Sequence, residues 1–268
     1  RGNVLFRKLL LLGLAAFALI HPALAQEAPA TDDPQLARIA QMSLKELEAF
    51  LSVVATAVNQ DSLKLRGLAQ TNDCLDLTRA ANSFALGYIY LGAVRDTAAK
   101  RPERDGQLVR VQAIQLRVTT FAARIRAEEW VTQRCSRFAV PAEQASDARY
   151  ARPAKVTNAE YTDAVIDARQ AAETNLAIAV NAGISAKCPD VVVASQNIAL
   201  LLPYLQKLLV DTAKRPEVLG PRASRRGLEI SRRQLTAAFD KLQAEFGDKC
   251  RTPKPAPAPA ETESKPAE

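Results

Sequence analysis

The feature that most constrains the fold is an internal repeat. The phrase DTAAKRPE at 96–103 returns, one residue shorter, as DTAKRPE at 211–217. At the same offset of about 114 residues, the triplet CLD at 74–76 falls on CPD at 188–190. Self-similarity at a fixed distance indicates a repeated structural unit, so we expect a tandem duplication.

Each copy, 43–135 and 157–250, is predicted to form three helices in an up-down-up order. Both copies open with a capping box of the form [ST]-x-x-[EQ], at 43–46 and 157–160, which satisfies free amides at a helix start. Apolar residues of the first copy then recur every three or four positions, the period of one helix face. They are Leu44, Leu47, Leu51, Val54, Val58, Leu65 and Leu68. The predicted fold class is all-α.

The repeated phrase is expected to be the turn between the second and third helices of each copy. The residue before a proline is disfavoured in the α region, so each second helix should end at the KRP step. Asp96 and Lys100 are four residues apart, as are Asp211 and Arg215, and each pair is expected to interact. A repeated contact surface is the alternative.

The four cysteines are expected to pair as Cys74–Cys135 and Cys188–Cys250. An up-down-up order brings the start of the second helix and the end of the third to the same end of a unit. Of the three connectivities open to four cysteines, only this one closes each copy on itself. Each bridge would stabilise its copy by about 4 kcal/mol in the chain-entropy model. Pairing between the copies stays open if the two bundles pack end to end.

Residues 1–25 have the pattern of a secretory signal peptide. Basic Arg7 and Lys8 precede an apolar run, and small residues precede Gln26. The run is short for a membrane span, and no later run of about 18 apolar residues follows it. We therefore expect an exported protein, periplasmic or secreted, with no membrane span after cleavage. An uncleaved anchor is the alternative.

Three segments outside the copies are expected to be linkers or tails. Residues 26–42 should form a polar linker with a possible short helix, and 136–156 should link the two copies. Residues 251–268, rich in proline, alanine and charge, should be a disordered tail that acts as an extended spacer.

The composition excludes several catalytic chemistries. The one histidine, His21, lies in the predicted signal peptide, so Ser-His-Asp triads, Cys-His pairs and imidazole metal sites are excluded from the mature chain. With the cysteines paired and no Gly-rich phosphate loop, we expect no enzyme activity, no metal and no cofactor. The formal net charge of +7 falls by three on cleavage, a bias too weak to indicate nucleic-acid binding.

Arginines on the two predicted third helices form a candidate anion-binding stripe. The five residues are Arg110, Arg117, Arg124, Arg225 and Arg232. The first three recur every seven residues, which places them on one helix face. Such a stripe could hold an anionic glycan, a lipid head group or an acidic protein surface. The alternative is a solvated face that pairs with neighbouring acids.

A second candidate is a buried polar layer. Asp61 falls within the apolar register of the first helix, and its repeat mate is Asn175. A buried carboxylate needs partners, because an unpaired charge is costly to bury. The residues expected at its level are Asn82 or Ser83 on the second helix and Arg124 or Arg126 on the third. The layer is interpreted as structural rather than as a ligand site.

The favoured function is a non-catalytic interaction or scaffold module of the cell envelope, with another exported or envelope protein as its partner. Such a module should expose an apolar or aromatic patch that includes residues such as Phe84, Tyr88 or Ile198. The alternative is a carrier for an anionic or lipidic ligand held between helices. The small-residue run 177–186 and a kink at Pro203 could then leave a cavity.

Overall fold

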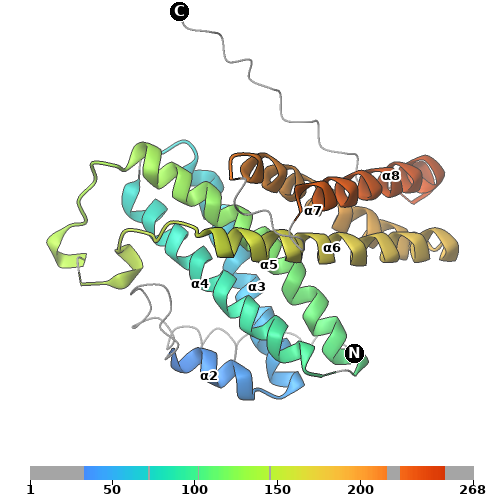
Figure 1. Ribbon diagram of the computed structural model, residues 1–268, viewed down its shortest axis with the longest axis horizontal. Coiled ribbons are helices and arrows are strands. Elements are labelled where there is room, and N and C mark those ends of the chain that lie inside the picture. The colour runs from blue at the N-terminus through green and yellow to red at the C-terminus, as the bar shows by residue number, and fades with distance from the viewer. Residues whose placement is uncertain (1–32, 72, 102, 145, 216–223, 251–268) are drawn as a thin grey trace, which may run out of the picture.

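The computed structural model describes residues 33–71, 73–101, 103–144, 146–215 and 224–250. Within these ranges the chain forms α-helices and two short 3-10 helices, without a strand (Figure 1). The elements are α2 (Pro34–Gln41), α3 (Leu44–Leu68), α4 (Cys74–Ala99), α5 (Arg104–Arg134), η1 (Ala142–Gln144), η2 (Ala148–Tyr150), α6 (Asn158–Ser185), α7 (Cys188–Ala213) and α8 (Arg225–Cys250). The all-α class is therefore confirmed. The predicted signal peptide and the segment 251–268 lie outside the described residues.

Local sequence signals determine where the helices begin. Ser43 caps α3, and the Glu46 carboxylate accepts a hydrogen bond from the Ser43 amide at 2.7 Å, which completes a capping box. Thr157 and Glu160 form the same arrangement before α6, where the corresponding bond is 2.8 Å long. Both predicted capping boxes are confirmed. The short helix α2 lies in the segment where one was considered possible.

The first group of helices packs around α4, which contacts α2, α3 and α5. Side chains on most of its circumference are buried, as expected for a helix covered on several sides. The Tyr90 hydroxyl donates to the carboxylate of Asp33, the cap of α2, at 3.3 Å. The Tyr90 ring also meets Phe50 of α3 edge-on, with the ring centroids 6.1 Å apart. These contacts hold α2 and α3 against the central helix.

The second group consists of α6, α7 and α8, which all contact one another. Pro189 occupies the first turn of α7, where its missing N–H costs nothing. The helix continues through Pro203 to Ala213. Ile198 and Leu205 lie on the buried face of α7, while much of its opposite face is exposed.

Two disulfides join the helix ends. Cys74 at the start of α4 is bonded to Cys135 after α5, with 5.5 Å between the Cα atoms. Cys188 at the start of α7 is bonded to Cys250 at the end of α8, with a Cα separation of 5.0 Å. The expected pairing is the one found. The described part of the chain contains no free cysteine.

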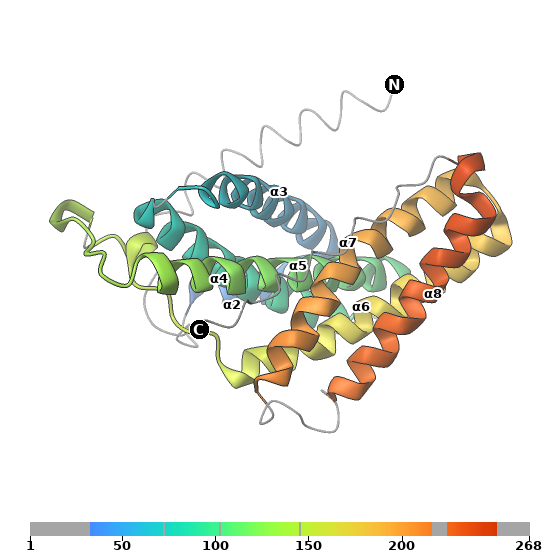
Figure 2. The same ribbon diagram turned by 90° about the horizontal axis from the view of Figure 1, so that it is seen from above.

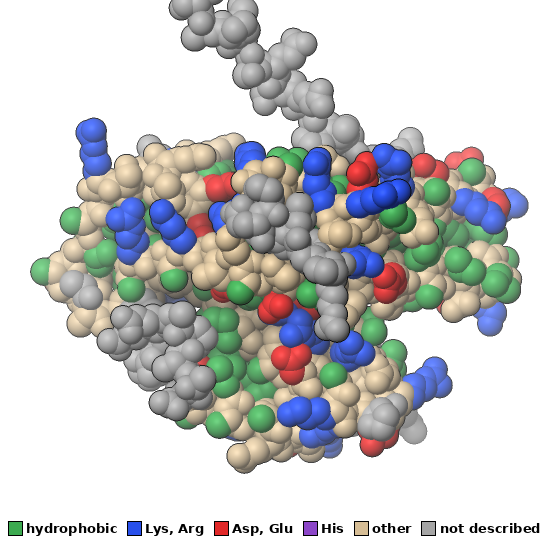
Figure 3. Space-filling model, in the orientation of Figure 1, with side chains coloured by type: hydrophobic (Ala, Val, Ile, Leu, Met, Phe, Trp, Pro, Cys, Tyr) green, Lys and Arg blue, Asp and Glu red, His purple; other side chains and the backbone are tan. Residues whose placement is uncertain are grey.

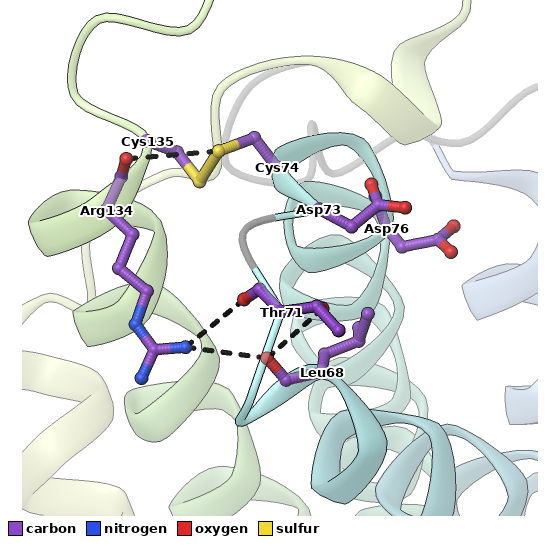
Figure 4. The surroundings of a disulfide bond; sticks show 7 residues. All are labelled: Leu68, Thr71, Asp73, Cys74, Asp76, Arg134 and Cys135. Carbon is purple, nitrogen blue, oxygen red and sulfur yellow. Dashed lines mark hydrogen bonds between the residues drawn. A yellow bond between two sulfur atoms is a disulfide. The ribbon is translucent and has the colours of Figure 1, made fainter.

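Arg134 reinforces the first disulfide (Figure 4). Its Nη1 donates to the carbonyls of Leu68, Ala69 and Thr71 at 3.4, 3.0 and 3.4 Å. These carbonyls belong to the end of α3 and the turn that follows it, where a helix leaves acceptors without intrahelical partners. The arginine thereby joins the last turn of α5 to the connection between α3 and α4.

The ion pairs at the ends of α4 and α7 differ from expectation. Asp96 pairs with the preceding Arg95 at 2.7 Å, and Asp211 pairs with Lys207, one turn earlier, at 3.3 Å. The predicted pairs with basic residues four positions later were therefore wrong. The reason is positional, because those later residues belong to the turn rather than to the regular helix.

The two helix groups meet along α5, which contacts α3 and α4 on one side and α6 and α7 on the other (Figure 2). Ile114 and Val118 of α5 belong to the same buried cluster as the apolar side chains of α6, α7 and α8. The ring of Phe121 lies 5.0 Å from that of Tyr88 and 5.2 Å from that of Tyr161, measured between centroids. A helix of the first group therefore forms one wall of the second core.

Candidate functional site

The candidate site in the described part of the chain is a set of ion pairs between the two helix groups, most of them buried or partly buried. We call this set the charged seam. Asp167 of α6 is fully buried, and its carboxylate accepts hydrogen bonds from Arg95 of α4, at 2.7 Å, and from Arg117 of α5. The Arg117 side chain is almost as buried, and Asp163 lies 3.6 Å from it at the edge of the seam. One carboxylate thus joins helices of both groups.

The packing of the Arg117 side chain depends on two residues of α4, Tyr88 and Gly92. The guanidinium carbon lies 3.9 Å from the centre of the Tyr88 ring, and Nε donates to the Tyr88 carbonyl at 3.2 Å. A Cβ added to Gly92 would lie 3.2 Å from the same Nε. Glycine at 92 therefore lets the arginine lie directly against the helix backbone, and the aromatic face adds a cation–π contact.

A second network of ion pairs surrounds Arg124, which lies about two turns after Arg117 on α5. Buried Arg124 donates to Glu128 at 2.8 Å and to Glu160, in the first turn of α6, at 2.6 Å. The Glu128 carboxylate also accepts a hydrogen bond from the amide of Val156 at 3.2 Å. Because Glu160 completes the capping box as well, one residue both starts α6 and fixes it to α5.

A third pairing completes the seam near the end of α7. Lys207 lies 3.2 Å from Glu129 of α5 and 3.3 Å from Asp211. Arg215 donates to the side chain of Asn158 at 3.2 Å, and its guanidinium lies 4.3 Å from the centre of the Tyr161 ring. The Lys207–Glu129 pair attaches α7 to α5 of the first group, whereas the Arg215 contacts join the end of α7 to the start of α6.

The electrostatics of the seam indicate a structural role. Burial raises the pKa of the Asp167 carboxyl, and the two guanidiniums beside it oppose that effect. Burial likewise raises the pKa of Glu128 against the effect of Arg124. For Glu160 burial acts in the same direction, but hydrogen bonds at the helix start and from Arg124 outweigh it and lower the pKa. Asp167, Glu128 and Glu160 thus each have an arginine partner.

The predicted arginine stripe is not a single surface. Arg117 and Arg124 lie inside the seam and pair with carboxylates, whereas Arg225 is exposed. Arg110 and Arg232 are partly buried, and the Nε of each is buried without a hydrogen-bond partner. The five residues therefore do not face one groove, because the face of α5 that carries two of them packs against α6.

The predicted polar layer is also divided. Asp61 is only partly buried and accepts a hydrogen bond from Ser83, one of the partners expected for it. Asn82 instead donates to two backbone carbonyls of the 136–156 segment. Asn175 is buried, donates to the Ala171 carbonyl at 2.8 Å and accepts from Gln115 at 3.3 Å. The predicted contact between Asp61 and the second helix is therefore found through Ser83, whereas Asn82 and Asn175 each serve a different contact.

Most of the large apolar side chains that are exposed in the described residues lie on α6 and α7, rather than at the positions predicted for the patch. Phe84, Tyr88 and Ile198 are all buried in the cores, so they form no surface patch. The outer face of α7, by contrast, exposes three apolar side chains along its length: Val193 at 52%, Leu200 at 64% and Val210 at 46%. We call these three residues the outer face of α7.

The exposed apolar surface of α7 continues onto its neighbouring helices. Apolar side chains also gather at the far ends of α6 and α8 (Figure 3), where Ile184 of α6 is 79% exposed. Among the described helices α7 alone has the length and hydropathy of a membrane-crossing segment, and only 33% of its most apolar window is buried. A large part of the apolar surface of α7 therefore has no cover from the described residues.

Comparisons with family models, with curated proteins and with solved structures gave no match to this chain. Fold and site together define an all-helical, disulfide-linked protein with a charged internal seam and an exposed apolar helix face. Within the described residues no group of three or more acidic, histidine or cysteine side chains is placed to hold a metal ion.

Sequence reasoning missed the central residue of the seam. Asp167 lies in a run whose neighbours on the same helix face, Ala164, Ala168 and Ala171, are all buried. An acid in the middle of an apolar helical register is the signal that could have identified it. Arg95 carried no comparable signal, because a basic residue near a helix C-terminus is ordinary.

Proposed function

We propose that this chain is an exported, non-catalytic helical protein that binds another protein of the cell envelope through the outer face of α7. The observation that carries the proposal is the exposure of Val193, Leu200 and Val210 along a single helix. Isolated exposed apolar residues are normal, but a row of them along one helix favours a docking surface. The paired disulfides agree with an oxidising compartment.

We further propose that the protein is a tandem duplication of two up-down-up units, 43–135 and 157–250. In support, α3, α4 and α5 correspond in order to α6, α7 and α8. Each set opens with a capping box and is closed by a disulfide between its second and third helices. The alternative of an anionic or lipidic carrier is weaker, because Arg117 and Arg124 already pair with carboxylates.

The docking proposal can be tested with a photo-crosslinking residue at Leu200 in the protein's own host. We expect a discrete intermolecular product, and we expect Val193→Glu to suppress it. Ile230 on α8 is 48% exposed and provides the matched control for both the crosslinker and the glutamate substitution. An equal product from Ile230, or none from Leu200, would contradict the proposal.

A further inference from the structure

The first helix group shows what covers the outer face of a second helix. After Cys135 the chain folds back over α4, and η2 contacts that helix. The Asn82 side chain donates to the carbonyls of Arg149 and Ala151 at 3.0 and 2.8 Å. Thr78, one turn earlier on the same face, is only 4% exposed. The segment that leaves the disulfide therefore covers the helix that begins at it.

The corresponding face of α7 has the same type of residues without such a cover. At the offset of 114 residues, Gln196 takes the place of Asn82, and Leu200 takes the place of Leu86. Leu86 is partly buried, whereas Leu200 is 64% exposed and Gln196 is exposed as well. An amide side chain is thus present at the matching position, and the described residues leave it facing solvent.

We propose that residues 251–268 bind in extended form along the outer face of α7, with Gln196 hydrogen-bonded to their backbone as Asn82 is to the 136–156 segment. The inference rests on the tandem duplication in the proposed function. The segment leaves α8 at Cys250, whose disulfide partner Cys188 is the first residue of α7, with 5.0 Å between their Cα atoms. It therefore starts at one end of the face that it would cover.

The length and charge of the segment fit this path. The 26 residues of α7 span about 39 Å at 1.5 Å per residue. In the polyproline II conformation, which suits the repeated Pro-Ala sequence, Glu261 and Glu263 would lie about 34 and 40 Å from Cys250. That distance would bring the two acids to the end of α7, where Lys214 is exposed. Proline rings and alanine methyl groups would then meet the apolar side chains of the outer face.

Occupation of this face by the chain itself would regulate the proposed docking surface. A tethered segment competes at an effective concentration set by its tether, so a partner must displace it before binding. Removal of residues 251–268 should then increase partner binding without any change in the helices.

The test uses the purified, oxidised full chain with a photo-crosslinking residue at Val210 or, as control, at Ile230. Both positions are partly exposed, and they lie 22 residues after Cys188 and 20 residues before Cys250, at nearly equal reach from the start of the segment. We expect Val210 to yield several-fold more intramolecular product with peptides from 251–268 than Ile230 does. Equal yields from the two positions would overturn the proposal.

A second set of variants tests the contacts themselves. Gln196→Ala and the double change Glu261→Lys and Glu263→Lys should each lower the Val210 product towards the Ile230 level, while the thermal melt stays unchanged. An undiminished product in all of these variants would also overturn the proposal. The outcome is separable from the proposed function, because a partner crosslink at Leu200 in the host does not require the intramolecular product.

Discussion

At the scale of single residues, burial determines what the arginines of α5 do. A solvent-facing Arg117 or Arg124 would contribute little to stability, since exposed ion pairs are worth about 0–1 kcal/mol. Inside the seam both are held by carboxylates of α6. A buried pair need not stabilise the fold more than apolar residues would, but removal of one partner leaves an uncompensated charge. The seam therefore favours a specific docking of the two helix groups.

The change Asp167→Ala is expected to destabilise the protein by about 3–5 kcal/mol, because it leaves the buried guanidinium of Arg117 without its carboxylate. Urea unfolding followed by circular dichroism would measure the loss. Asp163→Ala is the control: the Asp163 side chain is 53% exposed, and its loss should cost less than about 1 kcal/mol. A similar loss of unfolding free energy in the two variants would show that burial of the Asp167 pair contributes nothing beyond an exposed ion pair.

Gly92→Ala is expected to lower the melting temperature, because the added methyl group would press on the Arg117 side chain. Overpacking of this kind typically costs about 1–3 kcal/mol. Gly67→Ala, where the added Cβ would meet nothing within 4 Å, should instead stabilise the helix by up to about 1 kcal/mol. Thermal melts of both variants would measure this. We expect the melting temperature to fall for Gly92→Ala and to rise for Gly67→Ala.

At the scale of elements, the helices and their starts were largely predictable, whereas the surfaces that they bury were not. Capping boxes at Ser43 and Thr157 and the cysteines at 74 and 188 mark helix starts by local chemistry, and the structure agrees. The burial of Phe84, Tyr88 and Ile198 depends on which elements cover α4 and α7. That information lies in contacts between distant segments rather than in helical periodicity.

Reduction of the two disulfides is expected to lower the melting temperature, with about 4 kcal/mol of chain-entropy stabilisation lost per bridge. The effect should be larger for Cys188→Ser with Cys250→Ser than for Cys74→Ser with Cys135→Ser. Near the first bridge, Arg134 still joins the helix ends through three carbonyls. Melts of the two double variants against the oxidised parent would measure this, and equal shifts would rule out a role for Arg134.

At the scale of the whole molecule, the two helix groups share a wall. α5 closes the first group and also contributes Ile114, Val118 and Phe121 to the core of the second. The sequence indicated two copies joined by a linker, but no periodic signal showed that the third helix of one copy would pack into the other. Such contacts join residues 36 to 78 positions apart, through side chains that a single helical stripe does not distinguish.

Separation of the two groups is expected to affect them unequally. A fragment of residues 156–250 would lose the apolar wall of α5 and leave Asp167 without Arg95 and Arg117. We expect it to lack a cooperative thermal transition by circular dichroism, while residues 33–142 retain one at a lower temperature. Mixing the fragments should restore part of the transition. If the fragment of residues 156–250 melts cooperatively by itself at the temperature of the full chain, its dependence on α5 is contradicted.

The double packing of α5 also has an evolutionary consequence. After a duplication, each copy is ordinarily free to drift so long as its own interior is maintained. A substitution on the shared helix α5 has to satisfy two interiors at once. We therefore expect α5 to change more slowly than α8, its counterpart in the proposed duplication, which packs against α6 and α7. If the two halves arose by the proposed duplication, this shared helix would prevent them from diverging as independent modules.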